Sequence, residues 1–169
     1  MTRTNTKKLT LTALFMALTC VATSIIKIPT VGTGGYIHPG DAFVILSGIL
    51  LGPLYGALAG GIGSALADLF GGYMVYVPIT LIVKAVIAAG VGFIYHHLAV
   101  KMNSILVKCI LCGVFATITV ALGYLVFEYF LYGAAALASV PANLIQGVSG
   151  LIISTLLLPF MKKIMSSLL

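Results

Sequence analysis

The stretch Ser64–Val86, SALADLFGGYMVYVPITLIVKAV, decides the fold because it places two charged side chains among apolar residues. Asp68 is one of only three acidic residues in the 169-residue chain, and Lys84 follows a run of aliphatic residues. A charge that faces lipid at mid-depth costs about 2.5–3.5 kcal/mol. We therefore expect both side chains to lie in helices and to face the interior of a bundle.

The composition supports a membrane protein. Hydrophobic residues make up 61% of the chain and charged residues 7%, and the mean hydropathy is +1.21. A soluble domain would carry roughly 25% charged residues. The apolar runs are continuous and lack the alternation of barrel strands. The sequence thus predicts an all-α integral membrane protein, with one membrane-embedded domain over residues 1–169.

The apolar runs predict the number of helices. Four spans are expected at residues 9–28, 76–95, 104–131 and 136–160, and a proline breaks the run 42–70 at Gly52-Pro53. If that run forms two helices, the basic residues near both chain ends and within 95–108 share one side of the membrane. The prediction is a bundle of six transmembrane helices with both termini cytoplasmic. Residues 42–51 would reach only about 15 Å, so the depth of this hairpin stays open.

Several functions are excluded or disfavoured. The net charge of +6 comes from lysines and an arginine at the ends of apolar runs, which is typical of membrane topology rather than nucleic-acid binding. Cys109 and Cys112 have no second pair or histidine cluster near them in sequence. No phosphate-binding glycine motif or nucleophile–base pair occurs. We expect no catalytic residues, metal or cofactor, and no enzyme activity.

Polar side chains recur at helical spacing on the predicted outer side. Tyr76, Thr80 and Lys84 share one helix face, as do Tyr124, Glu128 and Tyr132 on another helix. Together they predict an outward-facing pocket for a small, polar, partly aromatic molecule. The candidate binding residues are His38, Asp41, Asp68, Tyr76, Lys84, Glu128, Tyr132, Asn143 and Gln146.

Each of these residues also has a purely structural interpretation. Asp68 and Lys84 could form a buried ion pair between two helices, and Glu128 could extend outward to the interface. Asn143 and Gln146 could form interhelical hydrogen bonds, which contribute about 0.6 kcal/mol each. His38 could serve only the loop that contains it.

One segment resembles a known family. HPGDAFVILSGILLGPLYGALAGGIGSALADLFGGY, residues 38–73, is followed by Pro78, Thr80 and Lys84. With six short helices and an alanine motif on the first, it resembles the substrate-binding S components of energy-coupling factor (ECF) vitamin transporters. The resemblance covers essentially the whole chain and is strongest over residues 36–90.

The resemblance implies a subunit that captures a vitamin from outside and relies on partners for energy. Those partners are a membrane coupling protein and two cytoplasmic ATPases, in the bacterial cytoplasmic membrane. Docking on them would use the alanine motif, here Ala13 and Ala17. The subgroup that looks nearest is linked to pyridoxine-type vitamers and hydroxymethyl pyrimidine.

Residue types that are missing from the chain disfavour some substrates. The chain has no tryptophan for a large flavin-like stack, and the predicted outer side has no dense basic cluster for a polyanion, so riboflavin and folate rank lower. The first 37 residues contain no histidine, against a cobalt or nickel carrier. The alternative function is a self-contained, proton-coupled carrier or channel that uses Asp68, Lys84 and Glu128 as a relay.

Overall fold

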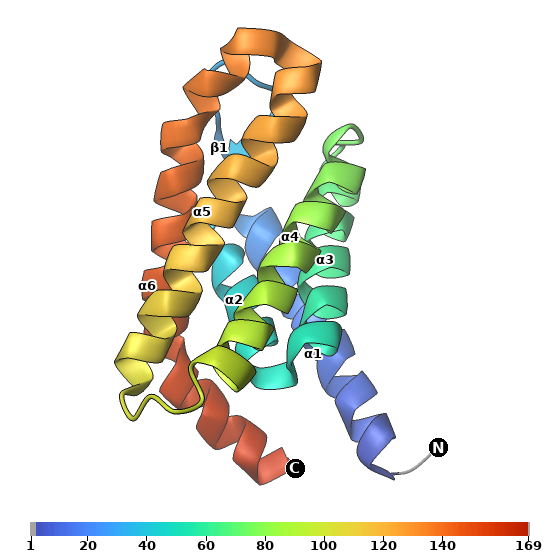
Figure 1. Cartoon of the computed structure of the whole chain (residues 1–169). Coiled ribbons are helices and arrows are strands. Elements are labelled where there is room, and N and C mark those ends of the chain that lie inside the picture. Colours follow the sequence, from blue (N-terminus) through green and yellow to red (C-terminus); the bar gives the residue numbers. More distant parts are fainter. Residues whose placement is uncertain (1–2, 169) are drawn as a thin grey trace.

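The computed structural model describes residues 3–168, with side chains for residues 6–166, so the predicted domain limits and the Arg3 side chain lie outside it. Within that range six α-helices form one bundle (Figure 1). They are α1 (Arg3–Ile25), α2 (Asp41–Leu51), α3 (Pro53–Phe70), α4 (Tyr76–Phe93), α5 (Ile105–Tyr132) and α6 (Val140–Leu168). A π-helical turn η1 (Ile94–Leu98) extends α4, and a 3-10 segment η2 (Gly133–Ser139) joins α5 to α6.

The helix bounds correct several predicted limits. α1 begins at Arg3 rather than residue 9 and ends at Ile25, so Lys27 lies in the following loop. α6 continues past residue 160 to Leu168 and contains Pro159. The predicted break at Gly52-Pro53 is confirmed: Gly52 has φ +82°, which favours glycine, and Pro53 starts α3.

Three helical stretches are long and apolar enough to cross a membrane. They are Thr6–Ile25, Tyr76–Leu98 and Ile105–Ser166, and the last contains α5 and nearly all of α6. α2 has 11 residues and is shorter than a span. The helical architecture is therefore confirmed and these lengths fit a membrane-embedded protein, while six crossings stay a prediction.

The loop between α1 and α2 contains a small antiparallel hairpin that the sequence did not predict. Strand β1 (Ile28–Pro29) pairs with β2 (Tyr36–Ile37), and Ile28 is opposite Ile37. Figure 1 places β1 near the upper part of the bundle, and both chain ends lie at the lower end. The loop of residues 26–40 therefore covers the end opposite the termini.

Close helix packing holds α1, α2 and α3 together. A Cβ on Gly56 would lie 2.7 Å from Gly48 Cα, and one on Gly63 would lie 2.5 Å from the Met16 carbonyl oxygen. Only glycine permits these approaches of α3 to α2 and to α1. Aliphatic residues such as Ile45, Ile87 and Val120 fill the core between the helices.

Candidate functional site

The polar cavity beneath the loop is the candidate site. It lies between the loop and helices α3 to α6, and its volume is about 10 Å³, roughly the room that one water molecule needs. Its lining is Thr30, Gly35, Tyr36, His38, Asp68, Tyr76, Thr80, Tyr124, Glu128 and Asn143. A vitamin-sized molecule would enter only if the loop or the helices around the cavity moved.

Asp68 places a buried carboxylate oxygen without a hydrogen-bond partner in the cavity. Its side chain is 3% exposed, and Oδ1 accepts a hydrogen bond of 2.6 Å from the Tyr36 hydroxyl. Oδ2 is buried and accepts no hydrogen bond from the described residues. Asp68 also lies in the last turn of α3, where the helix dipole disfavours a negative charge. Asp68 Oδ2 is thus left as an acceptor for a ligand.

Glu128 is held inside the bundle. It is 2% exposed, and Oε1 accepts from the Tyr76 hydroxyl at 2.9 Å while Oε2 accepts from the Ser139 hydroxyl at 2.5 Å. Asn143 Nδ2 donates to the same Ser139 oxygen at 3.4 Å. The interpretation that Glu128 extends outward to the interface was wrong, because two hydroxyl donors hold it in place.

Lys84 forms an ion pair with Asp41, not with Asp68. The lysine is fully buried, and the Tyr124 ring centroid lies 5.2 Å from Nζ. Asp41 Oδ2 also accepts from Gln146 Nε2 at 3.1 Å. The structural alternative of an ion pair between Asp68 and Lys84 is thus wrong: the pair connects α2 and α4, because Asp41 at the start of α2 reaches the lysine.

The loop residues close the cavity from above. Gln146 Oε1 accepts a 3.0 Å hydrogen bond from the backbone N–H of His38, which ties the loop to α6. Burial, together with the positive charge of Lys84, lowers the pKa of His38 to about 3. His38 is therefore neutral, and Nδ1 accepts from the Gly40 N–H at 3.1 Å.

Tyr36 is clamped by aromatic and cationic neighbours. Its ring centroid lies 4.5 Å from that of Tyr73, and Lys27 Nζ lies 4.8 Å from the Tyr36 centroid and 5.0 Å from the Tyr73 centroid. Burial, and then the hydrogen bond to Asp68, raise the pKa of Tyr36 well above its ordinary value. The phenol thus stays protonated and donates to Asp68.

The structure brings most of the predicted binding residues together. Five of them line the cavity: His38, Asp68, Tyr76, Glu128 and Asn143. Three others, Asp41, Lys84 and Gln146, form the hydrogen-bonded network described above and are absent from the lining. Tyr132 is 37% exposed and lies outside the lining. Ala13 and Ala17 are exposed on α1.

Sequence reasoning missed several lining residues. Thr80 and Tyr124 lie on the predicted polar stripes and hydrogen-bond to each other at 2.9 Å, so the helical spacing could have identified them. Tyr36, Thr30 and Gly35 come from the loop. A loop has no periodic face, so no sequence signal assigned these three to the cavity.

A comparison with protein families shows to which family this chain belongs. The family described as the ECF-type riboflavin transporter S component matches residues 3–163, nearly the whole chain. The chain belongs to this S-component family. Members of the ECF S-component family are parts of transporters rather than enzymes, which agrees with the membrane-embedded bundle.

Two curated relatives are similar to this S component over most of their length. An uncharacterized protein of Pyrococcus woesei is 37% identical over 134 residues, which are 79% of this chain and 86% of the relative. The thiamine precursor transporter HmpT of Lactococcus lactis subsp. cremoris is 28% identical over 162 residues, which are 94% of this chain and 90% of the relative. The second relative supports the resemblance to the hydroxymethyl pyrimidine-type subgroup.

Proposed function

We propose that this S component captures a small, protonatable heterocycle of the hydroxymethyl pyrimidine or pyridoxine type from outside the cell. It would deliver the molecule by docking, through Ala13 and Ala17 on α1, on a coupling protein with two ATPase subunits. The protein would lie in the bacterial cytoplasmic membrane with both termini in the cytoplasm. The proposal draws on the family, on the name of the Lactococcus relative and on the chemistry of the cavity.

The unpartnered Asp68 Oδ2 is the observation that carries the substrate class. Lys84 forms its ion pair with Asp41 rather than with Asp68 or Glu128. Hydroxyl groups of Tyr36, Tyr76 and Ser139 already donate to three of the four oxygens of these carboxylates, so Asp68 Oδ2 is the one left to accept from a ligand. A ring with an amino group or a protonated nitrogen would donate to Oδ2, while Tyr76 and Tyr124 would contact its faces.

The cavity disfavours a large or anionic ligand. Riboflavin, named in the family description, has a three-ring system, and this chain offers no tryptophan to stack on it. Two buried carboxylates would also repel a phosphate or carboxylate group. The carrier alternative has less support, because Ile87, Ala88 and Val91 lie directly below Lys84 on α4 and are buried and apolar.

Calorimetric titration of the purified protein tests the substrate. We expect hydroxymethyl pyrimidine or pyridoxine to bind more tightly than riboflavin. Asp68→Asn should weaken binding by about tenfold to a hundredfold, because a hydrogen bond to a charged group contributes about 1.5–3 kcal/mol. Tyr129→Phe, at a 55% exposed position on α5, is the control and should bind as the wild type does.

Two results would overturn parts of the proposal. Tightest binding of riboflavin would refute the substrate class. Uptake of the ligand by cells that express this chain without a coupling module would refute the S-component mechanism and favour the self-contained carrier.

A further inference from the structure

A tyrosine contacted by two lysines lies at the end of the bundle opposite the cavity. Tyr95 belongs to η1, and Lys162 Nζ donates to its hydroxyl oxygen at 2.6 Å. The Tyr95 ring centroid lies 5.2 Å from Lys162 Nζ and 5.5 Å from Lys108 Nζ. All three side chains are half-buried. We call these three residues the Tyr95 cluster.

No acidic side chain neutralises this cluster. The sequence has three acidic residues, Asp41, Asp68 and Glu128, and all three are buried at or beside the polar cavity. The Tyr95 ring and hydroxyl oxygen offset only part of the charge, since a cation gains only modest stabilisation from an aromatic ring. Two half-buried ammonium groups that share one ring therefore form a site where an anion would be stabilised.

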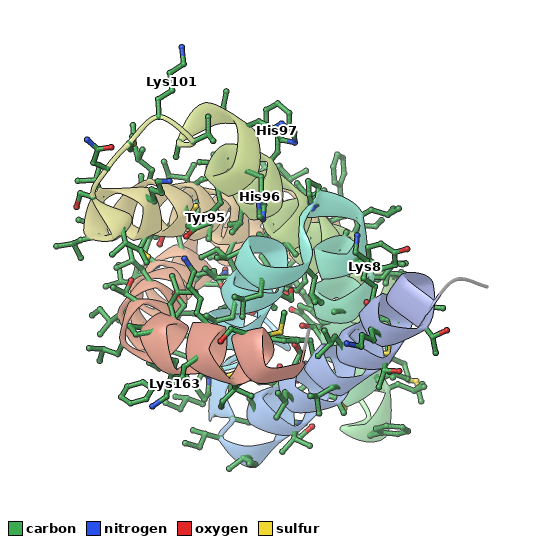
Figure 2. The ribbon with its side chains drawn as sticks, turned by 90° about the horizontal axis from the view of Figure 1, so that it is seen from below. Lys8, Tyr95, His96, His97, Lys101 and Lys163 are labelled. Atoms are coloured by element: carbon green, nitrogen blue, oxygen red, sulfur yellow. The ribbon has the colours of Figure 1, made fainter. Side chains whose placement is uncertain are left out.

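The surroundings of the cluster are apolar and exposed. Leu98 is 65% exposed and follows Tyr95 by one turn, Ile105 is 46% exposed at the start of α5, and Phe160 is 69% exposed near Lys162. Figure 2 views this end of the bundle from below and shows Tyr95 on η1 within it, whereas Lys101 extends away from the ribbon. The cluster thus lies where basic and lipid-facing surfaces meet.

We propose that the Tyr95 cluster binds the phosphate of an anionic phospholipid headgroup. Lys162 uses one N–H on Tyr95 and has two further donors, and Lys108 provides a second ammonium group. The Tyr95 hydroxyl accepts from Lys162, so its own proton is available for a phosphate oxygen. The lipid chains would lie along the exposed apolar residues. This site is independent of the vitamin cavity and of the substrate proposed for it.

Tyr95 lies in the π-helical turn η1. The Ala99 N–H bonds to the Ile94 carbonyl at 2.8 Å, five residues back, which widens the helix at this point. Such turns are rare and occur frequently at functional sites. His96, next in sequence, bonds through Nε2 to the Ile49 carbonyl oxygen at 2.8 Å and anchors the turn to α2.

Native mass spectrometry of the full chain, titrated with phosphatidylglycerol or phosphatidylcholine in detergent, tests the site. We expect one phosphatidylglycerol to remain bound, and phosphatidylcholine to bind far more weakly. Lys108→Gln/Lys162→Gln should weaken phosphatidylglycerol binding by about thirtyfold, because each lysine near an anionic surface contributes about 1 kcal/mol. The control Lys101→Gln/Lys163→Gln removes the same charge at two exposed positions and should change binding by less than threefold.

An arginine variant tests the site if Lys108→Gln/Lys162→Gln does not fold. Lys108→Arg/Lys162→Arg keeps the charge and should retain the lipid. Equal binding of the two lipids to the wild type would refute the site, as would an equal loss in the control pair. Inorganic phosphate, added as a soluble competitor, should not displace the lipid at millimolar concentration; displacement would show that the site takes free phosphate instead.

Discussion

Replacing Lys84 by methionine should strongly destabilise the protein. The lysine is fully buried and its partner Asp41 is 2% exposed, so the substitution leaves a carboxylate buried without its cation. Breaking a buried ion pair in this way costs about 3–5 kcal/mol. For a chain of this size each kcal/mol lowers the melting temperature by about 2–4 °C, so the expected decrease is on the order of 10 °C.

Thermal unfolding in detergent, followed by circular dichroism, measures this effect. Lys101→Met removes a charge from an exposed position and is the control, with an expected change within about 0.5 kcal/mol. Asp41→Asn/Lys84→Met should be more stable than the sum of the single changes by about 2 kcal/mol, because neither charge is then left alone. The reasoning is refuted if Lys84→Met melts like Lys101→Met, or if the double variant shows only the sum of the single effects.

Three further predictions test the docking surface and the loop. Ala17→Trp should abolish uptake with the coupling module while ligand affinity stays within about threefold. Ile118→Trp, at a 52% exposed position on α5, is the control and should keep both uptake and affinity. Equal loss of uptake in the two variants would contradict docking through Ala17. The pKa of His38 is about 3 in the folded protein and about 6.5 in the unfolded chain. Between pH 3 and pH 6.5 the His38 imidazole is therefore protonated in the unfolded chain but not in the folded protein. The stability of the protein should thus fall as the pH falls below 6.5. By pH 5 the free energy of unfolding, measured by thermal unfolding, should be about 2 kcal/mol lower than at neutral pH. This loss should be absent in His38→Asn, whose side-chain oxygen replaces Nδ1 as acceptor. If the variant kept the pH profile of the wild type, another group would be responsible. Tyr36→Phe removes the donor to Asp68 and should speed ligand dissociation about tenfold in stopped-flow measurements, and an unchanged rate would show that this hydrogen bond does not hold the loop.

Helical spacing brought three of the candidate residues to the cavity, and their role in binding stays a prediction. Tyr76, Glu128 and Asn143 line the cavity because side chains three or four apart share a helix face, and lipid excludes polar faces from the outside. The same reasoning could have included Thr80 and Tyr124. It could not reach the loop residues, whose backbone has no repeating geometry.

Pairing between helices was beyond the sequence. Asp68 was the partner considered for Lys84, although Asp41 is also an acidic residue on the same predicted side of the membrane. The structure selects Asp41 and leaves Asp68 to accept from Tyr36. Because Lys84 pairs with Asp41, Asp68 Oδ2 has no hydrogen-bond partner among the described residues. The proposed substrate class depends on this oxygen.

The sequence by itself determined that this chain is an all-α membrane protein, that Gly52-Pro53 separates two helices and that the acidic residues avoid the basic end. These follow from local composition and from the cost of charge in lipid, which act on each segment separately. Only the tertiary structure decided which carboxylate neutralises Lys84 and how the loop of residues 26–40 covers the cavity. Both depend on the packing of helices far apart in the chain, because a hydrogen bond or ion pair requires contact within a few ångströms.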